Sequence, residues 1–377
     1  MSMMDHSNDF LSLIDIDTSL KIFKCLDDPA DLVRVCCVSR SWRHFVVTNG
    51  LSKQLCLRMF PQLSRVASVV ELNQNGVNGQ TDVGSSQSIS PALQKDHRVY
   101  SYFANSCLSP VAVDCIAKAI GASSTDNFPQ ESIDHTLDER DNVAGRFSYW
   151  SSSGQSNPNV PETLTYHLTS QICVITEINI QPFQAHFQMG SPIYSAKSVR
   201  FKMGHLKASL DDLAGETIPK KRDNLADESE KYVWTYTSPE FPMAKENRLQ
   251  KFTLPEPVLC IGGILQIELL ERVQRQEMDG LLYICVAHVQ ALGIQLSPAF
   301  TVDVLGPSGM FVLKRNHRPN CQPTVTSENE SEAIITDRHF RQIVTILRAQ
   351  VMGVEPMDGW DEDEYEIDDD FDENNPL

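Results

Sequence analysis

The sequence lacks several features that mark large classes of protein. Its apolar runs are all shorter than the roughly 18 residues that a membrane-spanning helix needs, so we expect no membrane span. No basic segment precedes an apolar stretch at the N-terminus, which argues against a secretory signal. We therefore expect an intracellular protein of the cytoplasm, the nucleus or both. Lys and Arg are also scarce, at 32 against 50 Asp and Glu, and this deficit argues against binding to nucleic acid.

Signatures of catalysis and of metal binding are missing as well. The chain contains no GxSxG elbow, HExxH pair, Walker-type GK[ST], GxGxxG or EF-hand loop. None of the ten cysteines forms a CxxC pair, and several lie inside apolar runs, as reduced thiols of intracellular proteins commonly do. We therefore expect a protein that is not an enzyme and that has no resident metal or cofactor.

Composition divides the chain of 377 residues into four parts. Residues 10–63 are rich in helix formers, whereas residues 64–96 are dominated by Gly, Asn, Ser and Gln and are predicted to be a flexible linker. Residues 97–315 contain many short runs of β-type residues after a helical lead-in. Residues 316–377 contain a loop, an amphipathic helix predicted at 336–351 and an acidic tail.

Negative charge is concentrated in the C-terminal tail. The formal net charge is −18, and the segment from Asp358 to Glu373 holds eleven acidic residues and no Lys or Arg. Without that segment, the rest of the chain carries only −7. Repulsion between the acids disfavours compaction, so we expect a disordered tail that is separate from the folded body.

The first part has the spacing of several short amphipathic helices. Asp17 is placed to cap the first helix, Asp28 with Pro29 the second, and Ser39 the third. Apolar residues occupy more than one face of the first helix. A helical unit this small buries little area by itself, so we expect part of its apolar surface to be covered by a partner.

Three motifs in this part resemble the F-box. They are LKIFKCL at 20–26, PADLVRV at 29–35 and VSRSWR at 38–43, and the spacings between them also fit the family. One departure is that Ile14-Asp15 stands where the family has Leu-Pro. The missing proline changes the expected first contact with an adaptor. The resemblance to the F-box rests on the other three motifs and is not affected.

The resemblance implies docking on a Skp-type adaptor of a cullin-RING ubiquitin ligase. Compact helical units bury excess apolar surface against a partner groove, and aromatic anchors are prominent in such interfaces. For each residue, a place in the core of the helical unit is the alternative to direct contact. The residues that the resemblance assigns to the adaptor contact, or to the core beneath it, are Ile14, Leu20, Ile22, Phe23, Leu26, Leu32, Val35, Val38 and Trp42.

The third part is predicted to be an antiparallel β-sandwich of jelly-roll type. Two short helices are expected first, at 98–108 and 111–121. Apolar residues then recur with period two, as in TLTYHL at 163–168 and SVRFKMG at 198–204, which is typical of half-buried strands. Because no helices separate these runs, the pattern favours a sandwich over an α/β fold, giving an α+β chain of several domains.

The beginning of the sandwich resembles a discoidin-like, galactose-binding-type domain. The resemblance is carried by ASSTDNFPQESIDHTLD at 122–138, RFSYWSSSG at 146–154 and PETLTYHL at 161–168. The whole chain is also similar to a plant family of F-box proteins with this two-part layout. Arg146, Tyr149 and Trp150 are candidates for a stacking and hydrogen-bonding patch that binds substrate. The alternative for Trp150 is a place in the core.

The two resemblances together imply a substrate-recognition subunit of an SCF-type E3 ubiquitin ligase. The F-box would dock on the Skp-type adaptor, which joins it to a cullin, and the sandwich would bind a protein or glycoprotein substrate of unknown identity. Two alternatives remain open. One is a glycan-binding module on an F-box scaffold, and the other is an F-box adaptor that acts outside a cullin ligase.

Overall fold

The computed structural model describes residues 10–72, 89–108, 111–139, 142–143, 146–207, 231–306 and 309–316. All of these except Arg146 belong to one compact unit. The predicted helix at 336–351 and the acidic tail lie outside the described residues.

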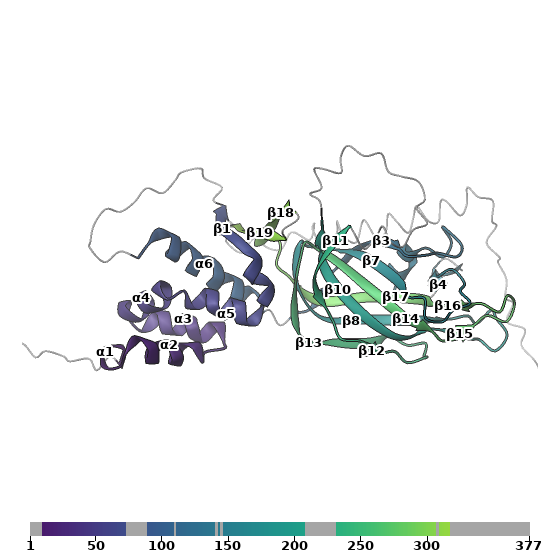
Figure 1. Cartoon of the computed structure of the whole chain (residues 1–377), viewed down its shortest axis with the longest axis horizontal. Coiled ribbons are helices and arrows are strands. Elements are labelled where there is room, and N and C mark those ends of the chain that lie inside the picture. Colours follow the sequence, from purple (N-terminus) through teal and green to yellow (C-terminus); the bar gives the residue numbers. More distant parts are fainter. Residues whose placement is uncertain are drawn as a thin grey trace, which may run out of the picture. The chain divides into compact units, whose positions relative to one another are not determined.

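The N-terminal part is helical, as predicted, and most of its helices begin at the expected residues (Figure 1). Asp28 and Ser39 cap the helices that follow them by accepting hydrogen bonds from the amides of Ala30 and Trp42. Within the described residues, no helix is both long and apolar enough to cross a membrane. The helices are α1 Phe10–Leu13, α2 Ile16–Lys24, α3 Pro29–Val38, α4 Arg40–Thr48, α5 Leu51–Met59 and α6 Pro91–Ser106, with the 3-10 helix η1 at Pro61–Arg65.

The cap of α2 differs from the prediction. Asp15, not Asp17, has the extended backbone of a cap and accepts a hydrogen bond of 2.8 Å from the amide of Thr18. Asp17 lies in the first turn, where a negative charge interacts favourably with the exposed amides of the helix start. The prediction was wrong by two residues because two acidic residues precede the apolar stripe.

A small aromatic core holds the first helices together. Phe23 packs edge-on against Trp42, with ring centroids 5.4 Å apart, and also contacts Phe45. Arg58 of α5 donates hydrogen bonds to the carbonyls of Lys24 and Leu26, which satisfies the end of α2. The buried members of this core are Phe23, Leu32, Val46, Leu51 and Leu55.

The rest of the described chain consists mainly of β-strands, connected by loops and one 3-10 helix, η2 at Ile133–Leu137. The strands are β1 Val66–Leu72, β2 Val113–Asp114, β3 Ile116–Ala122, β4 Asn142–Val143, β5 Arg146–Phe147, β6 Trp150–Ser151, β7 Glu162–Leu168, β8 Ile172–Gln184, β9 Ile193–Tyr194, β10 Ala196–Leu206, β11 Tyr232–Thr237, β12 Phe241–Pro242, β13 Gln250–Ile261, β14 Ile264–Arg272, β15 Gln274–Arg275, β16 Leu282–Tyr283, β17 Cys285–Gln295, β18 Phe300–Leu305 and β19 Met310–Asn316.

Two antiparallel sheets confirm the predicted β-sandwich (Figure 1). One has the order β11-β10-β14-β7-β3, and the other has the order β13-β8-β17-β2. The alternating residues Leu164, Tyr166 and Leu168 of β7 all enter the core between the sheets. The two runs that are apolar on both faces form β8 and β17, which are central strands as expected.

A second core lies at one end of β8 and includes residues of the helical part. Phe60, Tyr100 and Phe103 are buried there with Ile172 at the start of β8. A three-stranded sheet of order β1-β19-β18 contributes to the same cluster, and its β1–β19 pairing is parallel. Helices α5 and α6 and the sandwich therefore share one apolar cluster.

The structure corrects the prediction of a flexible linker at 64–96, because both ends of this range are structured. Its start forms β1, which pairs with β19, and its end belongs to α6. The β-branched run VASVV, from Val66 to Val70, has a strand partner only because residues near position 311 return to it. The polar segment 73–88 lies outside the described residues.

The second helix predicted in the lead-in is also wrong. Residues 113–122 form β2 and β3, and β3 pairs with β7. The first predicted helix, at 98–108, falls largely within α6. A short apolar run such as VAVDCIAKAIG fits either periodicity, and here the free edge of β7 favours the strand.

The described cysteines are all free thiols. Five are buried, as expected, whereas Cys25 directly after α2 and Cys37 on α3 are exposed. Burial raises the pKa of Cys260 and of Cys285 to about 12, which keeps both as neutral thiols. The buried thiols therefore behave as small apolar side chains.

Candidate functional site

The residues predicted to contact the adaptor divide into core and surface groups. Phe23 and Leu32 are only 4% and 5% exposed, and both belong to the helical core. Ile22 and Val38 are 46% and 59% exposed, so they are available to a partner. The remaining predicted residues are half-buried: Ile14, Leu20, Leu26, Val35 and Trp42.

Three exposed apolar residues of the helical part were missed by the sequence analysis. Leu13, Ile16 and Val33 are 69%, 66% and 40% exposed. The F-box motifs do not assign these three residues to the adaptor contact. Their side chains are exposed because they lie on the outward faces of the packed helices. We use the name F-box apolar surface for Leu13, Ile16, Ile22, Val33 and Val38.

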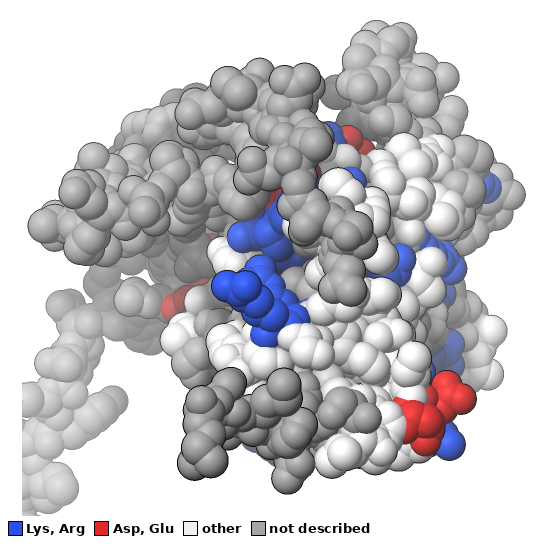
Figure 2. All heavy atoms as spheres, turned by 90° about the vertical axis from the view of Figure 1, so that its left-hand side faces the viewer, with Lys and Arg blue, Asp and Glu red and all other residues white. Residues whose placement is uncertain are grey.

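The helical part is basic, although the chain as a whole is acidic. Residues 15–60 contain seven Lys and Arg against five Asp. Figure 2 shows Lys and Arg gathered over a largely uncharged face, with few carboxylates. Lys21, Arg40 and Arg43 are among the exposed basic side chains. This combination of apolar and basic groups suits an acidic partner.

Trp150 is a core residue and not a binding residue. Its side chain is fully buried, and its indole nitrogen donates a hydrogen bond of 3.0 Å to the carbonyl of Ser124. The prediction that Trp150 contacts substrate is therefore wrong, and the alternative holds. The short strand β6 pairs with β17 and directs the indole into the sandwich core.

Tyr149, by contrast, is half-buried at the end of the sandwich. Its ring stacks on Phe183 with centroids 3.8 Å apart and an angle of 8°, and its hydroxyl donates to Glu131 Oε1 at 2.6 Å. Burial and the adjacent carboxylate raise the pKa of Tyr149, so the phenol remains neutral. The side chain of Arg146 lies outside the described part of the structure.

An aromatic cluster continues outward from Tyr149 and Phe183. Phe147 lies 5.9 Å from Phe183 and 5.4 Å from Phe187 between ring centroids. Phe147 and Phe187 are 39% and 56% exposed, and Met189 in the same turn is 91% exposed. The sequence analysis named Tyr149 but did not place it beside Phe183, Phe147 and Phe187, because these rings come from strands and turns that are distant along the chain.

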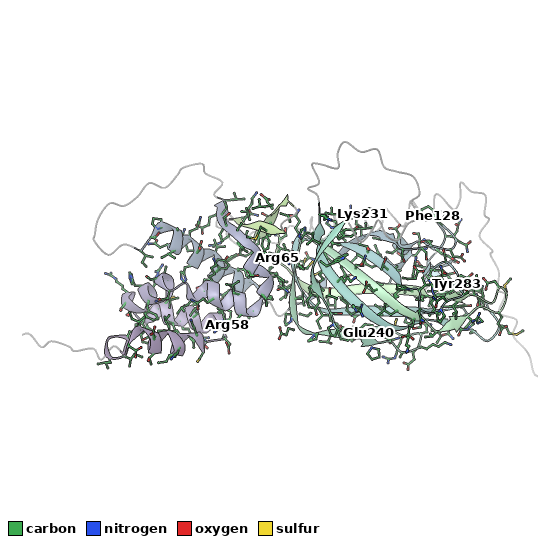
Figure 3. The ribbon with its side chains drawn as sticks, viewed as in Figure 1. Arg58, Arg65, Phe128, Lys231, Glu240 and Tyr283 are labelled. Atoms are coloured by element: carbon green, nitrogen blue, oxygen red, sulfur yellow. The ribbon has the colours of Figure 1, made fainter. Side chains whose placement is uncertain are left out.

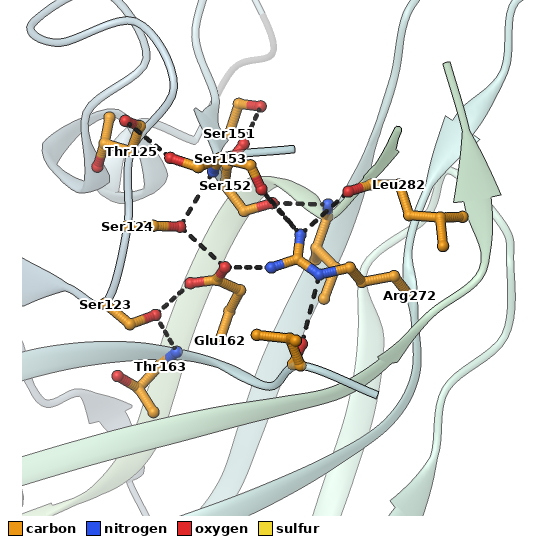
Figure 4. Close-up of polar contacts among 12 residues, drawn as sticks. Ser123, Ser124, Thr125, Ser151, Ser152, Ser153, Glu162, Thr163, Arg272 and Leu282 are labelled. Atoms are coloured by element: carbon orange, nitrogen blue, oxygen red, sulfur yellow. Dashed lines mark hydrogen bonds and ion pairs between the residues drawn. The ribbon is translucent and has the colours of Figure 1, made fainter. Parts of the chain in front are cut away.

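A buried ion pair holds the loops at this end together (Figure 4). Arg272 Nη2 contacts Glu162 Oε1, and both side chains are almost fully buried. Arg272 Nη1 donates to Ser152 Oγ at 2.7 Å, and Ser124 Oγ donates to the same carboxylate at 2.8 Å. These bonds join the loops after β3 and β6 to the ends of β7 and β14, so the loops form a fixed platform.

Tyr283 adds a second hydroxyl–carboxylate pair at the same end (Figure 3). Its hydroxyl donates to Asp279 Oδ2 at 2.5 Å, and this bond lowers the pKa of Asp279. The ring lies directly against Gly154, where an added Cβ would be 2.6 Å from its Cζ atom. Only glycine at position 154 leaves room for the ring in this position.

The open hollow beside β10 does not resemble a binding site. It has a volume of about 260 Å³ and is lined by Lys197, Ser198, Glu240, Pro242 and Glu271. Lys197 pairs with Glu271 at 2.6 Å, and Ser198 donates to Glu240, so these charged groups already have partners. Within the described residues, no group of His, Cys, Asp and Glu is arranged to hold a metal ion.

Solved structures that match part of this chain include carbohydrate-binding modules. The third CBM32 module of a family 31 glycoside hydrolase from Clostridium perfringens has 14% identity and a TM-score of 0.30, and the match covers 48% of this chain and 94% of that one. The F5/8 type C domain of a Bacteroides fragilis protein has 16% identity and a TM-score of 0.29, covering 48% and 97%.

Sequence comparison identifies the family of the helical part and finds a relative that matches most of the chain. The F-box-like family pattern matches residues 17–58. The F-box protein At4g00755 of Arabidopsis thaliana is 51% identical over 308 residues, which is 81% of this chain and 81% of that protein. The similarity thus extends well beyond the helical part into the sandwich. The chain belongs to the F-box protein family.

Proposed function

We propose that this chain is the substrate-recognition subunit of a cullin-RING, SCF-type E3 ubiquitin ligase. An F-box implies an adaptor or substrate-receptor role in such ligases, and F-box proteins are typically non-catalytic subunits. In this proposal the F-box docks on a Skp-type adaptor that joins a cullin, and the sandwich holds the substrate. The observation that carries the proposal is the F-box apolar surface, which lies outside a helical core that is already complete.

Burial of this surface supplies a physical reason for docking. Apolar area removed from water contributes about 25 cal/mol per Å², and the exposed Ile22 and Val38 contribute only when a partner covers them. The core beneath is held by Phe23 and by the Arg58 caps, so the helices present these side chains without refolding. Exposed basic residues beside them favour an acidic partner surface.

The receptor accelerates ubiquitin transfer by proximity and has no reaction of its own. A substrate on the sandwich and a charged ubiquitin-conjugating enzyme on the cullin belong to one assembly, so their effective concentration is high. The shared cluster of Phe60, Phe103 and Ile172 couples the end of α5 and α6 to the start of β8. Such packing favours a defined geometry over a free tether.

Co-purification with a Skp-type adaptor tests the docking step. The full-length Ile22→Gln/Val38→Gln variant removes two exposed apolar side chains, while Gln changes no charge and is compatible with a helix. We expect adaptor retention to fall by about tenfold or more, because central apolar anchors dominate such interfaces.

The matched control is Ile120→Gln, which changes an equally exposed isoleucine on β3 of the sandwich. This variant should retain the adaptor at the wild-type level. Circular dichroism and thermal melting establish that all three proteins are folded. Undiminished retention by the folded double variant would contradict the assignment of Ile22 and Val38 to the docking surface.

A further inference from the structure

The aromatic cluster at the end of the sandwich has the exposure of a binding surface. We use the name aromatic end patch for Phe147, Tyr149, Phe183, Phe187 and Met189. Single exposed apolar residues are common, but here two exposed rings contact each other and Met189 extends from the same turn. Contiguous exposed apolar groups of this kind are a feature of surfaces that bind other molecules.

The patch stands on rigid elements. Phe183 is buried on β8, the long central strand, and its ring supports Tyr149, Phe147 and Phe187. The neighbouring loops are fixed by the Arg272–Glu162 pair (Figure 4). Rigid aromatic side chains lose little entropy when a ligand covers them, so such a surface is suited to binding.

Carboxylates lie at the Tyr149 side of the patch. The loop 123–139 contains five Asp and Glu and no Lys or Arg, and the turn 276–280 contains two acids and no basic residue. Tyr149 connects the aromatic rings to this rim through its hydrogen bond to Glu131. The second oxygen of Glu131, Oε2, is buried and accepts no hydrogen bond, so its negative charge is only partly compensated.

Three of these carboxylates are close enough to act on one another. Burial raises the pKa of Asp126, and the charges of Glu131 and Asp279 raise it further. This mutual repulsion would be relieved by a bound cation. Two basic side chains of the described residues have partners of their own, because Arg275 donates to the carbonyl of Gly280 and Lys245 to the side chain of Gln274.

We propose that this end of the sandwich binds a basic segment of the substrate protein. The aliphatic stem of a Lys or Arg lies on the rings of Phe147 and Phe187, and its charged group is directed to the exposed carboxylates of Asp126 and Asp279. Aromatic faces and carboxylates both attract cations, so the two parts of the surface select the same ligand chemistry. This inference rests on the proposed function, since it names the substrate class that the receptor captures.

The polar groups favour this ligand over a neutral sugar. Sugar recognition needs several hydrogen-bond donors and acceptors that converge on one position. Here Arg272, Ser124 and Ser152 are used within the fold (Figure 4). The carboxylate of Glu131 accepts a hydrogen bond from Tyr149 of the patch, and Phe128 in the acidic loop is 77% exposed (Figure 3).

Fluorescence anisotropy with the full-length protein tests the proposal. The probes are a labelled twelve-residue peptide of alternating Lys and Leu, the same peptide with every Lys replaced by Glu, and a labelled galactose-containing oligosaccharide. The Asp126→Asn/Asp279→Asn variant removes two charges and preserves shape, and Phe187→Ala removes one exposed ring. Glu240→Gln, in the segment between β11 and β12 where Glu240 pairs with Arg200 of β10, is the control for loss of charge.

We expect the wild type and Glu240→Gln to bind the Lys peptide and not the Glu peptide. Affinity should fall about tenfold in the double variant and in Phe187→Ala, and it should weaken as salt is added. Equal binding of the Lys peptide by the wild type and both variants would overturn the proposal. So would absence of Lys-peptide binding by the wild type, with or without binding of the oligosaccharide.

Adaptor retention, measured on the same proteins, separates this proposal from the proposed function. The patch variants should retain the adaptor fully, whereas Ile22→Gln/Val38→Gln should lose the adaptor and keep the peptide. Loss of peptide selectivity with intact adaptor binding contradicts only the ligand class. Failure of the wild type to bind the adaptor would contradict the receptor role itself.

Discussion

At the scale of single residues, the most deeply buried ion pair of the described structure is the one between Glu162 and Arg272. Their side chains are 3% and 0% exposed, and serine hydroxyls and backbone carbonyls complete the coordination of both groups. A buried ion pair of this kind adds little to the free energy of unfolding compared with apolar side chains of similar volume. Removal of one partner is costly, because it leaves an uncompensated buried charge. The loops beside the aromatic end patch depend on this pair.

The Glu162→Ala variant should therefore lower the free energy of unfolding by about 3–5 kcal/mol. Urea denaturation followed by tryptophan fluorescence measures the change. Glu240→Ala is the control, because Glu240 is 47% exposed and its ion pair with Arg200 should contribute only about 0–1 kcal/mol. Similar losses in the two variants would show that Arg272 is stabilised without Glu162.

His97 of α6 makes stability depend on pH. Its Nδ1 atom lies 2.9 Å from Ser52 Oγ, and burial together with the charges of Arg43 and Arg98 lowers the pKa of His97. The unfolded chain then binds the proton more readily than the folded chain. The stability that neutral His97 contributes is fully present above about pH 6.5. It is lost as the pH falls through the lower pKa that His97 has in the folded protein.

The His97→Gln variant should therefore show a smaller decrease in melting temperature between pH 7 and pH 5 than the wild type. Differential scanning fluorimetry over that range measures the effect. His186→Gln changes an exposed histidine and should leave the wild-type decrease intact. An unchanged slope in His97→Gln would mean that the folded protein accommodates the charged imidazole.

Strand β8 organises the sandwich at the scale of secondary structure. Ile172 near its start belongs to the second core, and Phe183 near its end supports the aromatic end patch, roughly 35 Å away at the usual rise of a strand. Both neighbours of β8 pair with irregular register, and one shift in β17 lies between Leu292 and Gly293. The long strand thus links the helical part to the candidate substrate surface.

Gly293 tests how closely these strands pack. A Cβ atom at this position would stand 2.1 Å from the carbonyl oxygen of Val174, which is a backbone atom and cannot turn aside. Gly293→Ala should destabilise the fold by about 1–3 kcal/mol through overpacking. Gly121→Ala on β3, where an added Cβ meets no atom within 4 Å, is the matched control in chemical denaturation. Equal stability of the two variants would contradict close packing at the shift.

Local signals in the sequence predicted much at this scale. Asp28 and Ser39 cap their helices because side-chain caps depend on neighbouring residues alone, and the alternating residues of β7 enter the core as expected. The lead-in segment 111–121 was predicted wrongly, because its strand pairing depends on β7, more than forty residues away. Likewise, the motif pattern included Phe23 and Ile22 together, and only packing separates core from surface.

At the scale of the whole molecule, charge is distributed by part. The chain carries −18, with eleven acids between Asp358 and Glu373, whereas residues 15–60 have more basic than acidic residues. The F-box and the end of the sandwich therefore present different chemistry to different partners. One combines apolar and basic groups, and the other combines aromatic rings and carboxylates.

A receptor of a ligase must bridge its substrate surface to a cullin through the adaptor. Retention of a cullin on the immobilised full-length chain, with and without added Skp-type adaptor, measures this bridge directly. We predict that the cullin is retained only when the adaptor is present, and that Ile22→Gln/Val38→Gln retains neither. Retention of the adaptor without the cullin would contradict the ligase role and would place the F-box in a complex outside a cullin ligase.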